Sequence, residues 1–424
     1  MQTYENIIIG GGAAGLFCGA NLKNTRHRGR SLLVEKTSNF GSKLMLSGAG
    51  QCNFTHGGNI KNFLDKYGEN GRNIRKILYN FNNLKTVEFF EANGIDTLQR
   101  DDGKVFPKTM KSKDIRDFLV EKIRGNRIEM SVGVNVISIE KVDGKFAVRD
   151  DKGREYTSKN LVIATGGASY RNTGSDGGML EILKRAFPKL EVVPIKESLV
   201  PIYVENYKFS GISGIAIRDV KIEQIEKREK NNRTDCKKPT SIGDLLFTHK
   251  NLSGPVILNI SRYVDRGDKL KIDFLNGCSD IISGGKIRTE GVKKSALNYF
   301  VEMTNLPRGF LQIAIAQFIG DEMNGSVEKL GKRKIEKIFE NLRNYIVSVS
   351  GNGGFDVAMA TCGGVALDDI NKDTMEHRKV SGMYFAGEVL DVDGDTGGYN
   401  IQFAFSSGAA VAKSLLRAHD GGKR

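Results

Sequence analysis

The feature that most constrains this fold is the glycine pattern in the first fifteen residues. An apolar β-branched run at 7–9 leads directly into Gly-x-Gly-x-x-Gly, formed by Gly10, Gly12 and Gly15, and a helix-compatible stretch follows. The first glycine permits a tight turn, the second lets the backbone approach a pyrophosphate, and the third lets helix and strand pack closely. The N-terminal N–H groups and positive dipole end of such a helix face the phosphates. This order predicts a dinucleotide-binding domain of the α/β class.

An acidic residue supports that prediction. A second apolar strand, 31–34, is followed by Glu35, which lies 20 residues after Gly15. At that distance a carboxylate binds the ribose hydroxyls of an adenosine and repels a 2′-phosphate. A glycine-rich turn in an ordinary βαβ unit is the alternative, but it leaves the agreement of strand, turn, helix, strand and acid unexplained.

Two further glycine-rich segments are predicted to reach the same dinucleotide. The segment 41–55 is too polar and too rich in glycine for a core element, so we expect it to wrap backbone around the cofactor near its reactive ring. A plain surface loop is the alternative. The strand 160–164 ends in a second turn at 165–167, which lacks the Gly-x-Gly-x-x-Gly pattern. A single such pattern predicts one permanently held FAD, not paired FAD and NAD(P) domains.

The end of the chain returns to this chemistry. A strand over 382–386 runs into Gly387 and Glu388, and helical periodicity appears over 409–417. An acid after a strand and a glycine-rich helix start are suited to the ribityl chain and the pyrimidine edge of a flavin. The cofactor site is therefore predicted to be built from both ends of the chain.

At 424 residues the chain exceeds one typical core, so two or three domains are expected. Between 195 and 272, short alternating runs split by Gly, Pro and charged turns indicate a small antiparallel barrel or sandwich. Within it the charged tract 226–233 is predicted to be a mobile hairpin loop, and the pattern turns helical from 293 to 346. The predicted fold class is α/β, a Rossmann-like FAD-binding domain with an inserted small antiparallel β-barrel and a helical subdomain. The expected boundaries are 1–194 and 349–424 for the FAD-binding domain, 195–290 for the barrel and 291–348 for the helices.

One part of the helical region is amphipathic. We expect a helix that packs an apolar side on the core and exposes a basic face to water, in preference to a dedicated nucleic-acid reader. The apolar stripe consists of Ile335, Ile338, Phe339, Leu342 and Ile346. The cations near or opposite it are Lys332, Arg333, Lys337 and Arg343.

Charge and composition narrow the functional classes. The net charge of +14 attracts polyanions, although a lysine-rich composition without functional meaning is an open alternative. Five cysteines and five histidines are scattered without C-x-x-C, so neither a disulfide scaffold nor a metal site is predicted. No apolar run approaches the ~20 residues of a membrane span, and the chain enters a strand without signal-peptide features. A cytoplasmic protein without stable membrane association is expected, and no oligomeric state is predicted.

Together, 8–15, 43–53, 164–167 and 387–402 resemble the YhiN/BaiN-like FAD-binding oxidoreductases, also labelled the NAD(P)/FAD-dependent oxidoreductase or aminoacetone oxidase family. The resemblance covers nearly the whole chain. It implies FAD as the cofactor and NAD(P)H as a transient electron donor. The cofactor-binding positions implied by the motifs and the resemblance are Gly10, Gly12, Ala13, Ala14, Gly15, Glu35, Lys36, Lys43, Leu44, Ser47, Gly48, Asn53, Val134, Thr165, Gly166, Gly167, Gly387, Glu388, Asp391, Gly397, Gly398, Tyr399, Asn400 and Gln402.

The chain departs from the family pattern at one informative position. Members commonly have Ser-Gly-Gly-Gly-Arg-Cys-Asn, whereas the run 47–53 has Gln51 in place of the arginine. This removes a positive charge that could bind a phosphate or an acidic substrate group. FAD binding is expected to be unaffected, but the substrate does not carry over directly.

The resemblance implies a reductase of a C=C bond conjugated with a carbonyl. One branch resembles enzymes that reduce a uridine of 23S ribosomal RNA to dihydrouridine, and another is linked to steroid double bonds. The leading hypothesis is ribosomal RNA, with hydride transfer from flavin N5 to C6 and protonation of C5 by an acid. Cys52 is a candidate acid, with buried packing as its alternative, and Cys362 is the rival. A small-molecule enone or enoate reductase and a non-catalytic FAD-bound scaffold are the alternatives.

Overall fold

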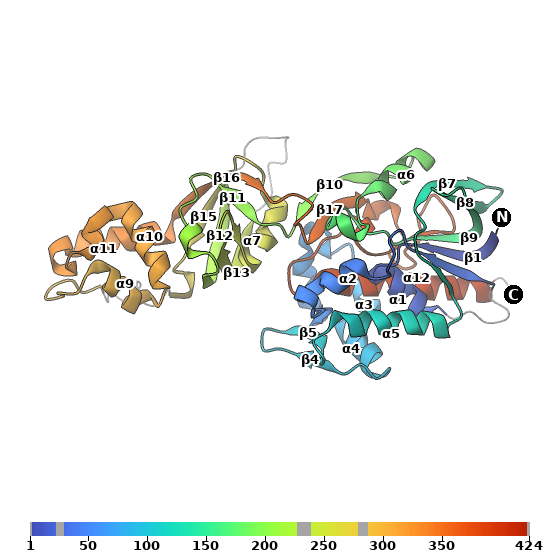
Figure 1. The fold of residues 1–424 in the computed structure, drawn as a ribbon, viewed down its shortest axis with the longest axis horizontal. Coiled ribbons are helices and arrows are strands. Elements are labelled where there is room, and N and C mark those ends of the chain that lie inside the picture. Colours follow the sequence, from blue (N-terminus) through green and yellow to red (C-terminus); the bar gives the residue numbers. More distant parts are fainter. Residues whose placement is uncertain (1, 23–28, 227–238, 279–286, 422–424) are drawn as a thin grey trace. The chain divides into compact units, whose positions relative to one another are not determined.

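The computed structural model describes residues 2–22, 29–226, 239–278 and 287–421 (Figure 1). The chain forms two compact units. The first consists of Met1–Glu197 and Met359–Arg424, and the second is the intervening Ser198–Ala358. The first unit is therefore made from both ends of the sequence, and the second is an insertion between its two parts.

The first unit is built on a seven-stranded sheet with the order β6-β2-β1-β9-β8-β7, in which β18 also pairs with β9. Neighbouring strands among β6, β2, β1, β9 and β18 are parallel, whereas β8 and β7 are joined to β9 by antiparallel pairing. The strands are β1 (Gln2–Ile9), β2 (Ser31–Val34), β6 (Glu129–Ser131), β7 (Val136–Val142), β8 (Lys145–Asp150), β9 (Glu155–Ile163) and β18 (Met383–Phe385).

Helices from both ends of the chain pack beside this sheet. Helix α1 packs against α12 and α5 (Figure 1). The strands β1, β2 and β18 are buried along most or all of their length, as expected for parallel strands in the interior of an α/β domain. The helices of this unit are α1 (Ala13–Asn21), α2 (Ser42–Leu46), α3 (Arg75–Asn80), α4 (Asn83–Glu91), α5 (Ser112–Gly125), α6 (Gly178–Ala186) and α12 (Tyr399–Gly421).

Two smaller sheets complete the first unit. A three-stranded antiparallel sheet has the order β3-β5-β4, with strands β3 (Thr55–His56), β4 (Thr97–Gln99) and β5 (Lys104–Pro107). A two-stranded sheet pairs β10 (Val192–Ser198) with β17 (Ala360–Val365). Since β10 precedes the insertion and β17 follows it, this pair brings together the two chain segments that flank the second unit.

The second unit contains a closed barrel with the order β11-β14-β13-β12-β15-β16, in which β16 pairs back onto β11. This confirms the α/β fold with an inserted antiparallel barrel. The strands are β11 (Ile202–Val204), β12 (Ala216–Glu226), β13 (Thr240–Phe247), β14 (Leu252–Ser253), β15 (Lys269–Asp273) and β16 (Tyr345–Asn352). The helices are α7 (Pro255–Ile260), α9 (Ala296–Thr304), α10 (Arg308–Ile319) and α11 (Val327–Arg343).

The structure corrects one detail of the expected amphipathic helix. Four members of its stripe are buried on α11, but Ile346 lies in β16 and is 57% exposed. Helix α11 ends at Arg343, and the following residues pair with β15, where Ile346 lies opposite Lys271. An apolar residue at helical spacing was therefore a strand residue, because a spacing of four residues satisfies both periods.

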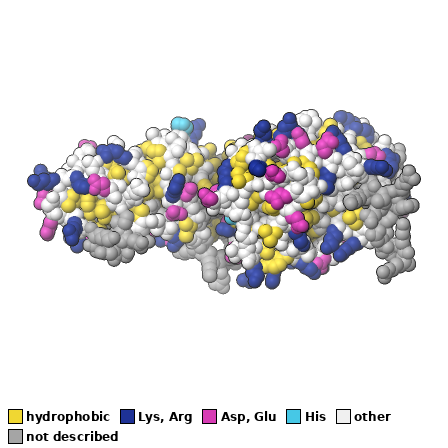
Figure 2. Space-filling view, turned by 90° about the horizontal axis from the view of Figure 1, so that it is seen from below, with side chains coloured by type: hydrophobic (Ala, Val, Ile, Leu, Met, Phe, Trp, Pro, Cys, Tyr) yellow, Lys and Arg dark blue, Asp and Glu magenta, His cyan; other side chains and the backbone are white. Residues whose placement is uncertain are grey.

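The remaining expectations concern the charged tract 226–233, membrane spans and the distribution of basic residues. Apart from Glu226, which ends β12, the tract 226–233 lies outside the described residues. None of the described helices is long and apolar enough to cross a membrane. Figure 2 shows Lys and Arg side chains spread over one face with Asp and Glu among them, without a continuous basic stripe on that face.

Candidate nucleotide-binding and catalytic site

The three glycines of the Gly-x-Gly-x-x-Gly motif, at the turn between β1 and α1 and in the first turn of α1, have different surroundings. An added Cβ at Gly15 would lie 1.9 Å from the Gly10 carbonyl oxygen, and one at Gly10, whose φ is +106°, would lie 2.4 Å from the Ala164 oxygen. At Gly12 an added Cβ would meet no described heavy atom within 4 Å. Gly10 and Gly15 are thus required by packing, whereas Gly12 faces open space at the N-terminus of α1.

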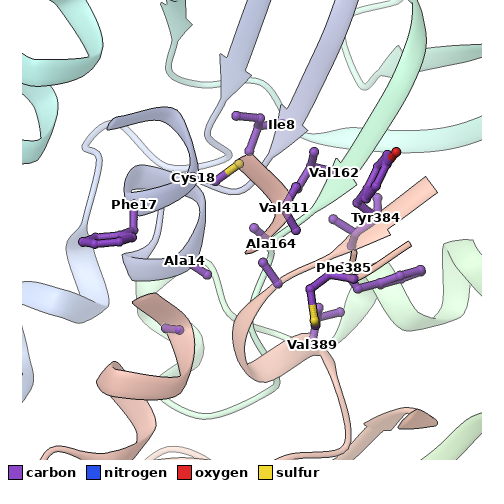
Figure 3. Close-up of a cluster of buried hydrophobic side chains, with 14 of the residues drawn as sticks. Ile8, Ala14, Phe17, Cys18, Val162, Ala164, Tyr384, Phe385, Val389 and Val411 are labelled. Carbon is purple, nitrogen blue, oxygen red and sulfur yellow. The ribbon is translucent and has the colours of Figure 1, made fainter. Parts of the chain in front are cut away.

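That helix start is available for an anion. Gly12 is the N-cap of α1, makes no side-chain cap hydrogen bond, and is followed by a first turn without an acidic residue, at Ala13 and Ala14. Figure 3 shows the buried side chains of Ile8, Ala14 and Val162 in the core beside this turn. A helix N-terminus on a rigid core, next to open space, has the geometry of a phosphate site.

Glu35 is held beside the same turn and is only 9% exposed. Its Oε2 accepts a hydrogen bond from the Gly11 N–H at 2.8 Å, and its Oε1 accepts two from Thr37, from the N–H at 2.7 Å and the hydroxyl at 2.9 Å. The Val134 N–H donates to the Glu35 carbonyl oxygen at 2.9 Å. Lys36 points elsewhere, since its ammonium pairs with Asp176 at 2.5 Å. Oε1 already accepts two hydrogen bonds, whereas Oε2 accepts one and retains an acceptor site for a ribose hydroxyl.

The loop after α2 has an unusual backbone. Ser47 closes it onto α2, because its hydroxyl donates to the Leu44 carbonyl oxygen at 2.6 Å and its own carbonyl accepts from the Cys52 N–H at 2.9 Å. The left-handed residues in this loop are Gly48, Ala49, Gly50 and Cys52. A left-handed conformation costs a non-glycine residue about 1–3 kcal/mol. Such conformations persist where the surroundings impose them, which is common at binding sites.

Asn53 connects this loop to the C-terminal part of the unit. With its amide nitrogen facing the carbonyl oxygens of Thr55 and Val105, its side-chain oxygen accepts from the Gly398 N–H at 3.1 Å. An added Cβ at Gly398 would lie 2.6 Å from the Thr55 oxygen, so the two segments touch closely. The N-terminus of α12, at Tyr399, is held next to the 47–53 loop in this way.

A partly buried polar network joins four segments near the glycine turns. The Lys43 ammonium donates to the Ser169 hydroxyl and to Glu388 Oε2, the latter at 2.5 Å. Glu388 Oε1 also accepts from the Ser169 hydroxyl at 3.0 Å and from the Thr361 N–H at 2.6 Å. The Thr361 hydroxyl in turn accepts from the Ala168 N–H at 2.8 Å. Lys43 and Glu388 were sequence candidates, whereas Ser169 and Thr361 carry no motif and were missed.

The turn after β9 contains an unsatisfied polar atom. Among the described residues, the buried hydroxyl of Thr165 has no hydrogen-bond partner. Gly166 has a φ of +75°, and an added Cβ at Gly167 would lie 2.4 Å from the Thr361 side chain. A buried hydroxyl without a partner costs free energy, which a bound polar ligand can recover.

The C-terminal candidates have different surroundings. Gly387 donates to the Ser407 hydroxyl at 3.0 Å, and an added Cβ there would lie 2.7 Å from the Ala14 Cβ. Asn400 binds the backbone of Gly394 with both amide atoms, at 2.7 and 2.8 Å. Burial is the largest influence on Asp391 and raises the pKa of its carboxyl, which accepts from a backbone N–H.

Gln402 and Tyr399 are engaged within the protein. Gln402 is fully buried, and its amide binds the Thr55 and Ser406 hydroxyls and the Phe81 carbonyl oxygen. Gln402 therefore anchors α12 to β3. The Tyr399 ring stacks on His56 with 5.3 Å between centroids, and Gly397 lies beside both rings.

The two candidate acids differ in exposure. Cys52 is fully buried, and burial raises the pKa of its thiol to about 12. Cys362 lies in β17, directly after Thr361, and is half-buried. The surroundings of Cys52 match its packing alternative, since a buried cysteine behaves as a small hydrophobic residue.

The residues around the glycine turns fit FAD. Gly12 leaves room for a pyrophosphate at the start of α1, Glu35 is fixed where a ribose would follow, and the Thr165 hydroxyl awaits a partner. No group of three or more His, Cys, Asp or Glu side chains suited to a metal ion occurs in the part of the chain that is described.

The fold, with its glycine turn opening α1, is that of an FAD-dependent oxidoreductase of the Rossmann type. The chain belongs to the HI0933-like family, since that family's Rossmann-domain model matches residues 4–414.

Comparisons with individual proteins extend over the full chain. It is 30% identical over 424 residues to the "Ribosomal RNA dihydrouridine synthase" of Haemophilus influenzae, which covers 98% of this chain and 99% of that one. It is 25% identical over 415 residues to the "3-dehydro-bile acid delta(4,6)-reductase" of Clostridium scindens, with 96% and 98% covered. The structure of 3-ketosteroid delta1-dehydrogenase from Sterolibacterium denitrificans matches with a TM-score of 0.50 and 11% identity, covering 99% and 100% of the two chains. That last match reflects the fold alone.

Proposed function

We propose that this protein reduces a uridine of 23S ribosomal RNA to dihydrouridine, with FAD as cofactor and NAD(P)H as electron donor. The observation that supports this substrate is the full-length, 30% identity to a protein named ribosomal RNA dihydrouridine synthase. The net charge of +14 supports a polyanionic substrate.

The residues of the first unit have separate roles in this proposal. Gly12 and the N-terminus of α1 hold the pyrophosphate, Glu35 the adenosine ribose, and Thr165 a polar group of the cofactor. Bound FAD, once reduced by NAD(P)H, would supply a hydride to C6 of the uracil ring. The protein must then place an acid where it can protonate C5, and must keep water away from the reacting atoms.

We assign the acid to Cys362 in preference to Cys52. Its half-buried side chain can reach a substrate that a fully buried thiol cannot touch. It also follows Thr361, whose N–H binds Glu388 in the network with Lys43. That network gives this part of β17 a fixed position and supports a defined direction for the neighbouring thiol.

A small-molecule enone reductase is the second candidate. One observation favours it: two of the four basic residues named on α11 are paired with acids of the same helix, Lys332 with Glu336 at 3.9 Å and Lys337 with Glu340 at 2.7 Å. The similarity to a bile-acid reductase supports the same reaction on a steroid.

Ribosomal RNA from a deletion strain tests the proposal. Nucleoside mass spectrometry should show loss of dihydrouridine from 23S RNA, restored by the wild-type gene but not by a Cys362→Ala gene that produces the same amount of protein. Unchanged dihydrouridine in the deletion strain would exclude this substrate and leave the enone.

The purified protein tests the cofactor independently. Heat release and chromatography should yield FAD, and stopped-flow reduction with NADH and with NADPH should identify the donor. FMN in place of FAD, or no flavin after reconstitution, would contradict the assignment at Gly12 and Glu35.

A further inference from the structure

Arg100, at the tip of the β4–β5 hairpin, differs from the cations around it. Lys104 is paired with Asp102 at 2.6 Å and Lys108 with Asp96 at 3.4 Å. Arg100 makes no ion pair with any carboxylate in the described part of the chain. The Arg100 charge is among those that lower the pKa of the Asp102 carboxyl, but no described carboxylate contacts the guanidinium directly, so it can bind a partner outside the protein.

The side chain is nevertheless held in place. The Arg100 guanidinium lies 4.2 Å from the centroid of the Phe106 ring, and its Nη2 donates to Gln51 Oε1 at 3.0 Å. Phe106 is only 2% exposed, so the surface under the guanidinium is rigid. Stacking and a hydrogen bond reduce the conformational entropy that an exposed arginine would lose on binding.

Its position links it to the candidate site. Gln51 belongs to the 47–53 loop, and Phe106 lies under the same loop, since an added Cβ at Gly48 would be 3.5 Å from its ring. The loop continues into Asn53, which is bonded to the turn before α12. The Arg100 guanidinium therefore binds a residue, Gln51, that is next in sequence to left-handed residues of this loop. The loop is expected to line the reaction site.

We propose that Arg100 binds a backbone phosphate of the RNA substrate and thereby positions the uridine for reduction. A guanidinium has five N–H donors, of which Gln51 uses one, so a fork of two remains for a phosphate. Arg100, in the β4–β5 hairpin, supplies the positive charge that is absent at Gln51, where family members commonly have arginine. This inference rests on the proposed function, and Arg100 acts as a positioning residue for the substrate.

The test compares Arg100→Gln and Arg100→Lys with Arg149→Gln as a matched loss of charge. Arg149 is a surface residue of β8 that is paired with Glu155. Binding of a protein-free 23S RNA transcript is measured by fluorescence anisotropy across a salt series, and KM and kcat are measured on the same transcript. FAD content and thermal stability serve as controls for folding.

We expect Arg100→Gln to weaken RNA binding and to raise KM on the order of ten- to a hundredfold, with kcat changed less than about twofold. The slope of log affinity against log salt should fall by about 0.7. Arg100→Lys should keep the salt slope but lower the RNA affinity, because an ammonium cannot bind a phosphate through two parallel N–H groups as a guanidinium does. Arg149→Gln should change neither.

Moving the positive charge from residue 100 to residue 51 provides the most specific test. Since Gln51 Oε1 and Arg100 Nη2 are 3.0 Å apart, the double variant Gln51→Arg with Arg100→Gln returns a guanidinium to nearly the same place and should recover most of the affinity. Equal behaviour of Arg100→Gln and Arg149→Gln, with an RNA-active wild type, would overturn this role but not the proposed function. A wild type that neither binds nor reduces the transcript would overturn the proposed function and this inference together.

Discussion

At Gly15 an added Cβ would lie 1.9 Å from a backbone oxygen, whereas at Gly12 it would meet no described atom within 4 Å. Glycines of one motif thus serve two purposes, packing and ligand access. At the same scale, Cys52 and Cys362 share a thiol but differ in exposure. The immediate surroundings of a residue, more than its type, decide what it contributes.

Alanine substitutions at the two glycines should separate stability from binding. Gly15→Ala should destabilise the apoprotein by about 1–3 kcal/mol, because the backbone must shift to admit the methyl group. Gly12→Ala should cost less than about 1 kcal/mol and yet weaken FAD at least about tenfold. Thermal unfolding of the apoprotein and FAD titration provide the two measurements. Equal loss of apoprotein stability in both variants would refute the distinction.

The two cysteines should respond differently to alanine. Cys362→Ala should slow reoxidation of the reduced enzyme by its substrate by about 10²- to 10⁴-fold, the contribution of a general acid. Cys52→Ala should leave that rate nearly intact and lower stability by about 1 kcal/mol. Single-turnover absorbance and urea unfolding measure the two effects. A slow Cys52→Ala with a normal Cys362→Ala would reverse the assignment.

Between β17 and β18, the segment that leads back to the main sheet contains a buried histidine. The Nδ1 of His377 accepts hydrogen bonds from the N–H groups of Lys379 and Val380, so its proton is on Nε2. Nε2 lies 3.8 Å from Asp369 Oδ2, and Lys379 also binds that carboxylate, at 2.6 Å. Burial lowers the pKa of His377 from 6.5, with Asp369 opposing and Lys379 reinforcing the shift.

This histidine predicts a pH dependence of stability. Below about pH 6.5 the unfolded chain binds a proton at His377 that the folded protein does not, so the free energy of unfolding falls as the pH falls. His377→Asn keeps an acceptor near Nδ1 and cannot titrate, so it should flatten the decline between pH 7.5 and 5. Urea unfolding of wild type and variant at both pH values measures this decline in the free energy of unfolding. The carboxyl of Asp369, whose pKa lies below 3.8, titrates outside this window. Parallel curves for wild type and variant would contradict this account.

For the whole molecule, the excess of basic residues matters only where the cations are available. On α11, Lys332 and Lys337 are paired with acids of their own helix, whereas Arg333 makes no ion pair among the described residues. Figure 2 shows the same mixing of both signs over one face. The net charge therefore overstates the local attraction of this helix for RNA.

Substitutions on α11 test that inference. Arg333→Gln should reduce the salt slope of RNA binding by about 0.7, and Lys332→Gln with Lys337→Gln should change it less per residue, because each has a competing carboxylate. Flavin content should stay normal in all of them. Salt-dependent anisotropy with the 23S transcript is the measurement. Affinity insensitive to salt and to every one of these residues would favour the small enone.

Much of the architecture followed from local patterns. The β1–turn–α1 unit, the return of the chain to the same sheet at β18 and the inserted barrel were predicted because each depends on glycine spacing or on hydrophobic periodicity over a few residues. Ile346 shows the limit of such patterns. Its spacing fits both a helix and a strand, and only pairing with β15 assigns it to β16.

The arrangement of side chains from distant segments was decided by the tertiary structure. Nothing local to Ser169, Thr361 or Arg100 marks them, because their partners lie far away in sequence, at Glu388 and Gln51. The same holds for the exposure of the two cysteines, which depends on what packs over each thiol. The sequence by itself determined the class of the domain and its nucleotide turn, since those rest on local backbone conformation. Which polar groups meet, and which remain free for a substrate, depended on long-range packing that no local pattern encodes.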